Sequence, residues 1–123
     1  MNKTLRNWTE KLIALAAGLG ATALWFINAC DLFYRCGCQS LWAGAAASCN
    51  IHTAGVPHCP WCIEGGQWGY ATFGLIVLAQ ACCALGADQA VFWKRLALTL
   101  AAFPIVAATA ALLFGWWTGY WSG

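Results

Sequence analysis

Charged residues are scarce in this 123-residue chain, where aspartate, glutamate, lysine and arginine together make up 8% of the sequence. Soluble domains contain roughly 25% charged residues, so the composition argues against a soluble globular protein. Only four carboxylates are present, and the sequence has neither a glycine-rich phosphate-binding loop nor a serine-nucleophile motif. These absences give little support to acid–base or nucleotide chemistry, and the net charge of +2 requires no nucleic-acid partner.

The chain has instead three long uncharged apolar runs, at residues 12–30, 65–87 and 96–117. A membrane-spanning helix needs about 20 apolar residues, so each run is a candidate span of a lipid bilayer. A cleaved signal peptide is the rival interpretation of the first run, but the bulky Trp25 and Phe26 stand where a cleavage site needs small residues. We therefore expect an all-α fold, in which residues 1–123 form a single membrane domain. This domain would be a three-helix integral membrane bundle with a cysteine-rich extracytoplasmic loop at residues 31–64.

The basic residues predict the orientation of this bundle. Five of the six lie before the first run or between the second and third runs: Lys3, Arg6, Lys11, Lys94 and Arg95. Only Arg35 lies in the loop. Since cytoplasmic segments carry the excess of lysine and arginine, the N-terminus should be cytoplasmic. The cysteine loop and the C-terminus should then be extracytoplasmic, and the membrane is expected to be a bacterial inner membrane.

Small and polar residues within the runs indicate helix–helix packing. Gly18 and Ala21 lie in the first run, where small side chains allow helices to approach closely. Gln80 is a polar residue within the second run, and we expect it either to hydrogen-bond to a neighbouring helix or to contact a quinone or an ion. A bundle with so few spans is expected to form a homo-oligomer or to serve as a subunit of a larger membrane complex.

Six of the eight cysteines lie in or beside the loop: Cys30, Cys36, Cys38, Cys49, Cys59 and Cys62. One hypothesis is structural. Disulfides persist outside the cytoplasm, and each bridge would stabilise a loop with little core of its own by about 2–4 kcal/mol. The protein would then be a disulfide-stapled accessory subunit of a larger complex.

A second hypothesis is redox catalysis at the motif Cys59-Pro60-Trp61-Cys62. Proline suits the first turn of a helix, so a helix is expected to begin at Pro60 with Cys59 at its cap. A helix N-terminus stabilises a thiolate, and the neighbouring His58 could add positive charge or carry a proton. Cys59, Cys62 and His58 are therefore the predicted catalytic residues of a thiol–disulfide oxidoreductase.

This motif, at the outer end of a predicted membrane helix, resembles the membrane thiol oxidoreductases of the disulfide-bond-forming protein B and vitamin K epoxide reductase families. The resemblance implies that Cys59 and Cys62 pass electrons to a quinone. It also implies an extracytoplasmic redox partner protein, which would meet a mobile shuttle pair. The candidates for this shuttle pair, or for structural disulfides, are Cys30, Cys36, Cys38 and Cys49. Those families have four-helix bundles, so with three spans a comparable quinone pocket would require two chains to assemble.

A third hypothesis is metal binding or metal transfer, with an extracytoplasmic metal-carrier protein as partner. The spacings in Cys-x-Cys and Cys-x-x-Cys suit a tetrahedral four-sulfur site, as for zinc. Thiolates also bind Cu(I), iron–sulfur clusters and other thiophilic ions such as mercury. The candidate ligands are Cys36, Cys38, Cys49, His52, His58, Cys59 and Cys62.

Cys82 and Cys83 lie apart from the loop, near the cytoplasmic end of the second predicted span. Buried cysteine often behaves as a small hydrophobic residue, which is one explanation of this pair. The alternative is a metal relay, because the paired cysteines resemble those in the helices of bacterial mercury-transport membrane proteins. The two interpretations remain open at the level of sequence.

Overall fold

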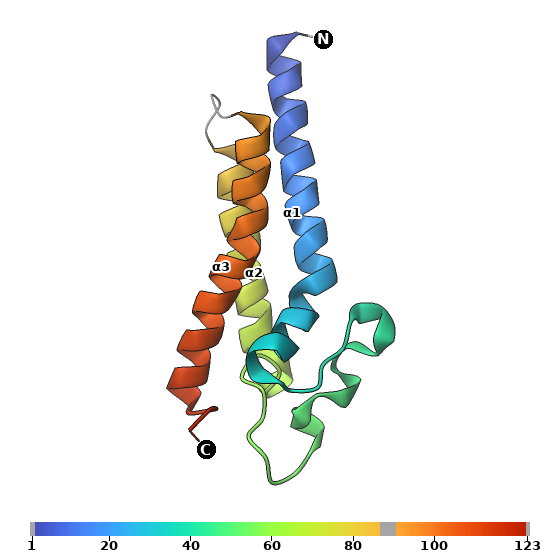
Figure 1. The fold of residues 1–123 in the computed structure, drawn as a ribbon, viewed down its shortest axis with the longest axis vertical. Helices are drawn as coiled ribbons and strands as arrows, with labels where there is room; N and C mark the ends of the chain where they lie inside the picture. The colour runs from blue at the N-terminus through green and yellow to red at the C-terminus, as the bar shows by residue number, and fades with distance from the viewer. Residues whose placement is uncertain (1, 87–90, 123) are drawn as a thin grey trace.

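The structure is a computed structural model that describes residues 2–86 and 91–122. It contains three long helices, α1 (Lys3–Tyr34), α2 (Gln67–Leu85) and α3 (Phe92–Thr118). The helices lie side by side, and each contacts the other two (Figure 1). The described residues contain no strand, so the predicted all-α class is confirmed for this part of the chain.

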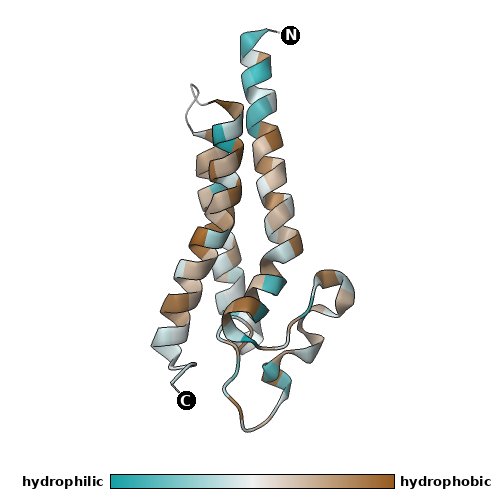
Figure 2. Ribbon diagram, in the orientation of Figure 1, coloured by the Kyte–Doolittle hydropathy of each residue, from teal (hydrophilic) through white to brown (hydrophobic). Residues whose placement is uncertain are grey.

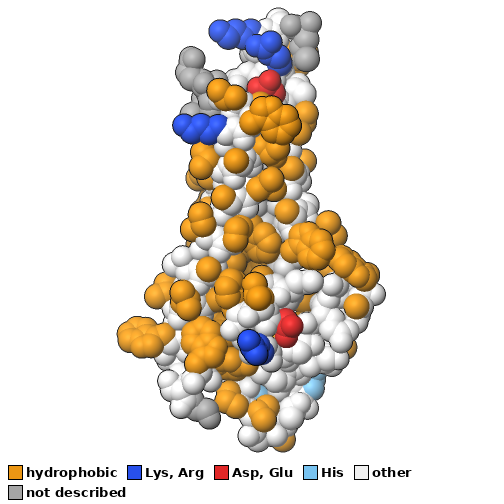
Figure 3. Space-filling view, in the orientation of Figure 1, with side chains coloured by type: hydrophobic (Ala, Val, Ile, Leu, Met, Phe, Trp, Pro, Cys, Tyr) orange, Lys and Arg blue, Asp and Glu red, His pale blue; other side chains and the backbone are white. Residues whose placement is uncertain are grey.

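All three helices are long and apolar enough to cross a membrane. Their outward faces carry large apolar side chains, such as Leu78 and Ile105, which are 62% and 63% exposed. Figures 2 and 3 show hydrophobic residues along the length of the bundle. The helix interface is instead lined by small or polar residues, among them Ala14, Ala107 and Thr99. This distribution is typical of membrane helices, whose outer faces meet lipid tails and whose interfaces favour close backbone approach.

Gln80 joins all three helices in the centre of the bundle. Its Nε2 donates hydrogen bonds to the carbonyl oxygens of Gly18 (3.0 Å) and Thr99 (3.2 Å), and its Oε1 accepts one from the Thr22 hydroxyl (3.0 Å). A Cβ at Gly18 would lie 2.6 Å from the Thr99 side chain. The predicted helix contact at Gly18 and the predicted interhelical bonding of Gln80 are therefore both confirmed.

The cysteine-rich region lies between α1 and α2, as predicted, and consists of irregular chain with short 3-10 turns. These turns are η1 (Leu41–Ala43), η2 (Ala45–Ser48), η3 (Asn50–His52) and η4 (Glu64–Gly66). The region forms a lobe beside one end of the bundle (Figure 1). The start of α1 and the start of α3, which carry five of the six basic residues, lie at the other end, whereas Arg35 lies at the end of α1 beside the cysteine-rich region (Figures 1 and 3).

The predicted helix start at Pro60 is wrong. Residues 60–62 form a turn, and α2 begins only at Gln67. The reason is that Gly65 and Gly66 adopt left-handed conformations, with φ of 74° and 81°. Two successive left-handed residues cannot continue a right-handed helix, and glycine adopts them without a steric penalty. Cys59 therefore does not cap a helix, and its chemistry must be explained by its neighbours instead.

Candidate metal centre formed by six cysteines

Six cysteine side chains from separate stretches of the chain meet in one cluster, which we call the six-cysteine cluster: Cys30, Cys36, Cys38, Cys49, Cys59 and Cys62. Cys30 comes from the last turns of α1, and the other five come from the chain between α1 and α2. Five of the six are buried, and Cys62 is half-buried. The cluster thus gathers soft sulfur ligands in a site that is largely shielded from solvent.

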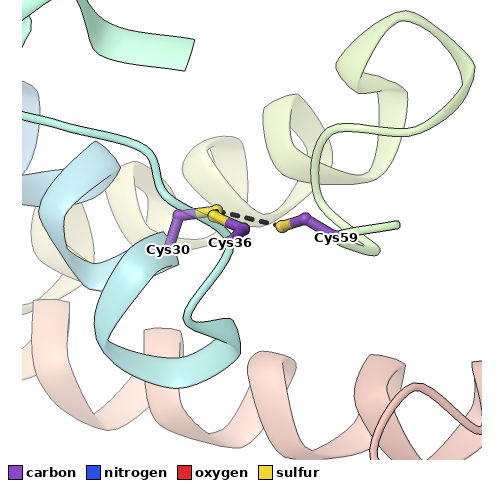
Figure 4. A group of neighbouring side chains, drawn as sticks. All are labelled: Cys30, Cys36 and Cys59. Carbon is purple, nitrogen blue, oxygen red and sulfur yellow. Dashed lines mark hydrogen bonds between the residues drawn. The ribbon is translucent and has the colours of Figure 1, made fainter. Parts of the chain in front are cut away.

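The sulfur atoms are close enough to share bound ions. The Cys30 Sγ lies 3.0 Å from that of Cys59, 3.4 Å from that of Cys36 and 3.9 Å from that of Cys62. The Sγ atoms of Cys38 and Cys62 are 4.0 Å apart. Figure 4 shows Cys30, Cys36 and Cys59, whose sulfurs point toward one another. The six sulfurs form four groups of three that could each hold a metal ion. Within each group, the three sulfurs lie within 4.8 Å of one another.

The end of α1 turns the chain back so that Cys36 and Cys38 approach Cys30. The helix stops at Arg35, which is left-handed (φ 48°) and whose N–H donates to the Asp31 carbonyl at 2.7 Å. The Asp31 carboxylate then accepts a hydrogen bond of 2.9 Å from the Gly37 N–H. Gly37 is itself left-handed (φ 92°), and a Cβ there would lie 2.5 Å from the Ser48 carbonyl oxygen. Glycine is therefore required between Cys36 and Cys38.

Asn50 holds the remaining cysteine segments against the first. Its backbone N–H donates to the Cys36 carbonyl at 2.7 Å, and its Oδ1 accepts from the Cys59 N–H at 2.7 Å. Its Nδ2 donates to the Tyr120 hydroxyl at 2.8 Å. The Tyr120 hydroxyl in turn donates to the Tyr34 carbonyl at the end of α1. Asn50 thus links the Cys36 and Cys59 segments to each other and to Tyr120, which follows the end of α3.

Trp61, which stands between Cys59 and Cys62 in the sequence, packs against α1 and α2. Its ring is buried and stacks on Phe26, with centroids 4.9 Å apart. Its carbonyl accepts a hydrogen bond of 3.1 Å from the Gly69 N–H, and a Cβ at Gly69 would lie 2.5 Å from that oxygen. Gly69 therefore lets the turn that carries Cys59 and Cys62 rest directly on α2.

An apolar cavity of about 620 Å³ adjoins the cluster. Its lining includes Phe26, Trp61, Tyr70 and Phe73, together with Cys62. Cys62 belongs both to the sulfur cluster and to this lining. A ligand in the cavity would therefore lie directly beside a thiol.

The disulfides proposed in the structural hypothesis are not seen among the described residues. All eight cysteines, each within the described residues, are free, and the shortest Sγ–Sγ contact given above, 3.0 Å, is longer than the bond of about 2.05 Å in a disulfide. The irregular segment is held by backbone and side-chain hydrogen bonds rather than by cross-links. The structure therefore shows a cluster of thiols where the structural hypothesis expected disulfide bonds.

The two histidines predicted as ligands or proton carriers lie in exposed positions. A ring nitrogen of His52 is 3.1 Å from the Ala46 carbonyl, and one of His58 is 3.0 Å from the Thr53 carbonyl. Within the described part of the chain, the potential metal-ligand groups contain only cysteine. Cys82 is exposed and Cys83 is half-buried on α2, and neither belongs to these groups.

Contacts between the sulfurs change their acidity. Cys36 and Cys62 share the same three hydrogen-bond partners, first Cys30 and then Cys38 and Cys59. These bonds lower the pKa of both thiols well below the usual value. Burial raises the pKa of Cys49 to about 11. Cys36 and Cys62 are therefore the thiols most prepared to be thiolates, which are the species that bind metals and attack disulfides.

Comparison with protein-family models, with curated proteins and with solved structures finds no match to this chain. The metal-ligand set predicted from the sequence did not include Cys30, and Asn50 was not singled out. In the sequence, only its position next to Cys49 relates Asn50 to the site. Its role follows from the hydrogen bond that it accepts from Cys59 in the folded chain.

Proposed function

We propose that this protein is an integral membrane protein that binds thiophilic metal ions in its six-cysteine cluster and exchanges them with a carrier protein outside the cytoplasm. The observation that carries the proposal is the convergence of six free sulfurs, five of them in buried residues, in overlapping groups within 4.8 Å. Soft thiolate sets select ions such as Cu(I) and Zn(II). Structural disulfides would pair sulfurs two by two, and they give no reason for all six to meet.

The proposed orientation places the cluster on the extracytoplasmic face. Its support is that the start of α1 and the start of α3, with five of the six basic residues, lie at the end of the bundle away from the cysteine-rich lobe (Figures 1 and 3). Three of the basic residues precede the apolar part of α1, and two more lie in the first turn of α3. By the positive-inside rule, both segments belong in the cytoplasm.

The test is elemental analysis of the full chain in detergent, purified anaerobically without chelator. We expect bound copper or zinc, and we expect the six cluster cysteines to resist alkylation until a strong chelator removes the metal. The Cys82→Ser,Cys83→Ser double variant is the matched control, because it removes two cysteines outside the cluster and should retain the same metal content. A metal-free protein that also fails to bind added copper or zinc under reducing conditions would contradict the proposal.

The cavity beside Cys62 favours a second candidate function, a quinone-linked thiol oxidoreductase. The cavity is apolar and large enough for a small quinone headgroup, and the Sγ atoms of Cys59 and Cys62 lie within 4.8 Å of each other. In the balanced step, the two thiols form one disulfide and transfer two electrons and two protons to a quinone, which becomes a hydroquinone.

This second function predicts that the reduced protein converts a soluble ubiquinone analogue to its hydroquinone, with one Cys59–Cys62 disulfide formed per quinone. The conversion is followed by quinone absorbance, and the disulfide by mass-spectrometric mapping. Cys62→Ser should abolish the reaction, whereas Cys82→Ser should leave it unchanged. Quinone that stays oxidised in the presence of fully reduced protein would exclude this function.

A further inference from the structure

The arrangement of the six sulfurs carries information beyond their number. This arrangement indicates how many ions bind and which metal they are. The inference rests on the metal-binding function proposed above. The four groups of three are Cys30–Cys36–Cys59, Cys30–Cys38–Cys62, Cys36–Cys38–Cys49 and Cys49–Cys59–Cys62. No pair of sulfurs occurs in two of these groups, so four groups of three pairs account for twelve of the fifteen possible pairs.

The three remaining pairs share no residue: Cys30 with Cys49, Cys36 with Cys62, and Cys38 with Cys59. Every sulfur thus has four neighbours within 4.8 Å and one partner outside its groups. This is the connectivity of an octahedron, in which each vertex touches four others and faces the sixth. The six sulfurs therefore surround one common centre instead of forming separate pairs.

The twelve close pairs enclose all eight faces of this octahedron, and the four groups above are one set of four alternate faces. Any two groups share one sulfur, and every sulfur belongs to two groups. Cys30, for example, is the sulfur that the first and second groups share, and Cys49 is the one that the third and fourth share. An ion on each of these four faces would have three sulfur ligands, and each sulfur would bridge two ions.

We propose that the six-cysteine cluster binds four Cu(I) ions as one tetranuclear thiolate core, in which each ion has three sulfur ligands and each cysteine bridges two ions. Cu(I) is a soft ion that accepts three thiolates in a trigonal arrangement. Zinc instead demands four ligands, which a face of three sulfurs does not supply. The sulfide core of an iron–sulfur cluster would hold its cysteine ligands farther apart than the contacts seen here.

The distances suit trigonal coordination. With metal–sulfur bonds of about 2.3 Å, three sulfurs around one ion lie about 4 Å apart. The contacts of Cys62 with Cys30 and Cys38 are 3.9 and 4.0 Å. The Cys30–Cys59 and Cys30–Cys36 contacts, at 3.0 and 3.4 Å, would open when ions bind. The sulfur ligands in these contacts thus lie at or somewhat below the separations that trigonal coordination needs.

The charge balance also favours Cu(I). Four Cu(I) ions and six thiols give a core with a net charge of −2 and release six protons, counted from the fully protonated cluster, and no electron is transferred. One divalent ion on six thiolates would leave a charge of −4, which is costly in a site with five buried residues. The ions must arrive as Cu(I), supplied by a Cu(I) chelate or a Cu(I)-carrying protein.

The test is an anaerobic titration of the reduced full chain in detergent with Cu(I), in competition with a Cu(I)-specific chelator. We expect cooperative binding of four ions per chain and the luminescence of solvent-shielded Cu(I)–thiolate cores. X-ray absorption of the loaded wild-type protein should show three sulfur neighbours per copper and a short copper–copper distance. This spectroscopic readout requires no variant, so it holds even where a substitution prevents folding.

Single cysteine-to-serine variants give the second readout. Because each sulfur bridges two ions, every one of the six cluster variants should lose at least two of the four bound ions, whereas Cys82→Ser and Cys83→Ser should retain all four. A single four-cysteine site would instead leave two of the six variants with unchanged metal content. Helical circular dichroism identifies any variant that fails to fold.

The outcomes separate this inference from the function on which it rests. Binding of one zinc or one copper ion per chain, without a copper–copper distance, would overturn the tetranuclear core and leave metal binding intact. Failure to bind copper or zinc at all would overturn both. Four coppers per chain that are lost equally in Cys82→Ser and Cys59→Ser would show nonspecific thiol binding and would also overturn the inference.

Discussion

The Asn50 side chain accepts a hydrogen bond of 2.7 Å from the backbone N–H of Cys59. This bond joins two cysteine-bearing segments that neither a helix nor a disulfide connects. Since Asn50 also bonds to the Cys36 carbonyl and the Tyr120 hydroxyl, its amide fixes the position of Cys59 relative to the rest of the cluster. The geometry of the six sulfurs should therefore depend on a residue that contributes no sulfur.

Asn50→Ala tests this dependence. The substitution leaves the Cys59 N–H without its acceptor, which should destabilise the folded state by about 1–3 kcal/mol. We expect faster alkylation of Cys59 and Cys62 and a weaker hold on bound metal in chelator competition. Tyr120→Phe is the matched control, because it removes the partner of the Asn50 Nδ2 and the bond to the Tyr34 carbonyl but keeps the acceptor of the Cys59 N–H, and it should have the smaller effect on the cluster. Equal metal affinities in wild type and Asn50→Ala would contradict the role of this bond.

Gly37→Ala should disturb the turn between Cys36 and Cys38. Gly37 and Gly55 both have positive φ, of 92° and 84°, but only at Gly37 would a Cβ meet a neighbour, the Ser48 carbonyl oxygen at 2.5 Å. Both alanine variants incur left-handed strain of about 1–2 kcal/mol. Only Gly37→Ala should also lower the number of metal ions bound, as measured by elemental analysis after dialysis. The same metal loss in Gly55→Ala would assign the effect to strain alone.

Gly69→Ala should push the Cys59–Cys62 turn away from α2. A Cβ at Gly69 would lie 2.5 Å from the Trp61 carbonyl oxygen, whereas one at Gly74 would meet nothing within 4 Å. Overpacking of this kind costs about 1–3 kcal/mol. We expect a changed Trp fluorescence spectrum and faster thiol alkylation in Gly69→Ala, and neither in Gly74→Ala. Identical spectra of the two variants would show that Trp61 does not rest on α2.

Gly18→Ala should weaken the bundle without acting on the cluster directly. The new Cβ would lie 2.6 Å from the Thr99 side chain and 3.2 Å from the Gln80 Nε2, whereas a Cβ at Gly20 would meet nothing within 4 Å. We expect a loss of about 1–3 kcal/mol in detergent-mediated unfolding for Gly18→Ala, while Gly20→Ala stays near wild type. If Gly20→Ala proved the more destabilising, the packing of α1 against α3 would be incorrectly assigned.

The sequence by itself determined the three apolar helices, the position of the cysteine-rich region between the first two, and the contacts of Gly18 and Gln80. These features depend on local composition. A long uncharged run has few alternatives to a helix in lipid, since every backbone polar group must be paired within the segment. A glycine and a glutamine within such runs have a clear role only at a helix interface.

Only the tertiary structure decided the state of the cysteines. Spacing alone singled out Cys59 and Cys62 as a helix-start pair, but left-handed Gly65 and Gly66 delay α2 and remove that helix N-terminus. The approach of Cys30 to Cys59 depends on the turn at Arg35 and on the Asn50–Cys59 hydrogen bond. Such contacts between residues distant in sequence leave no periodic pattern, so the octahedral grouping of six sulfurs emerges only when the chain is folded.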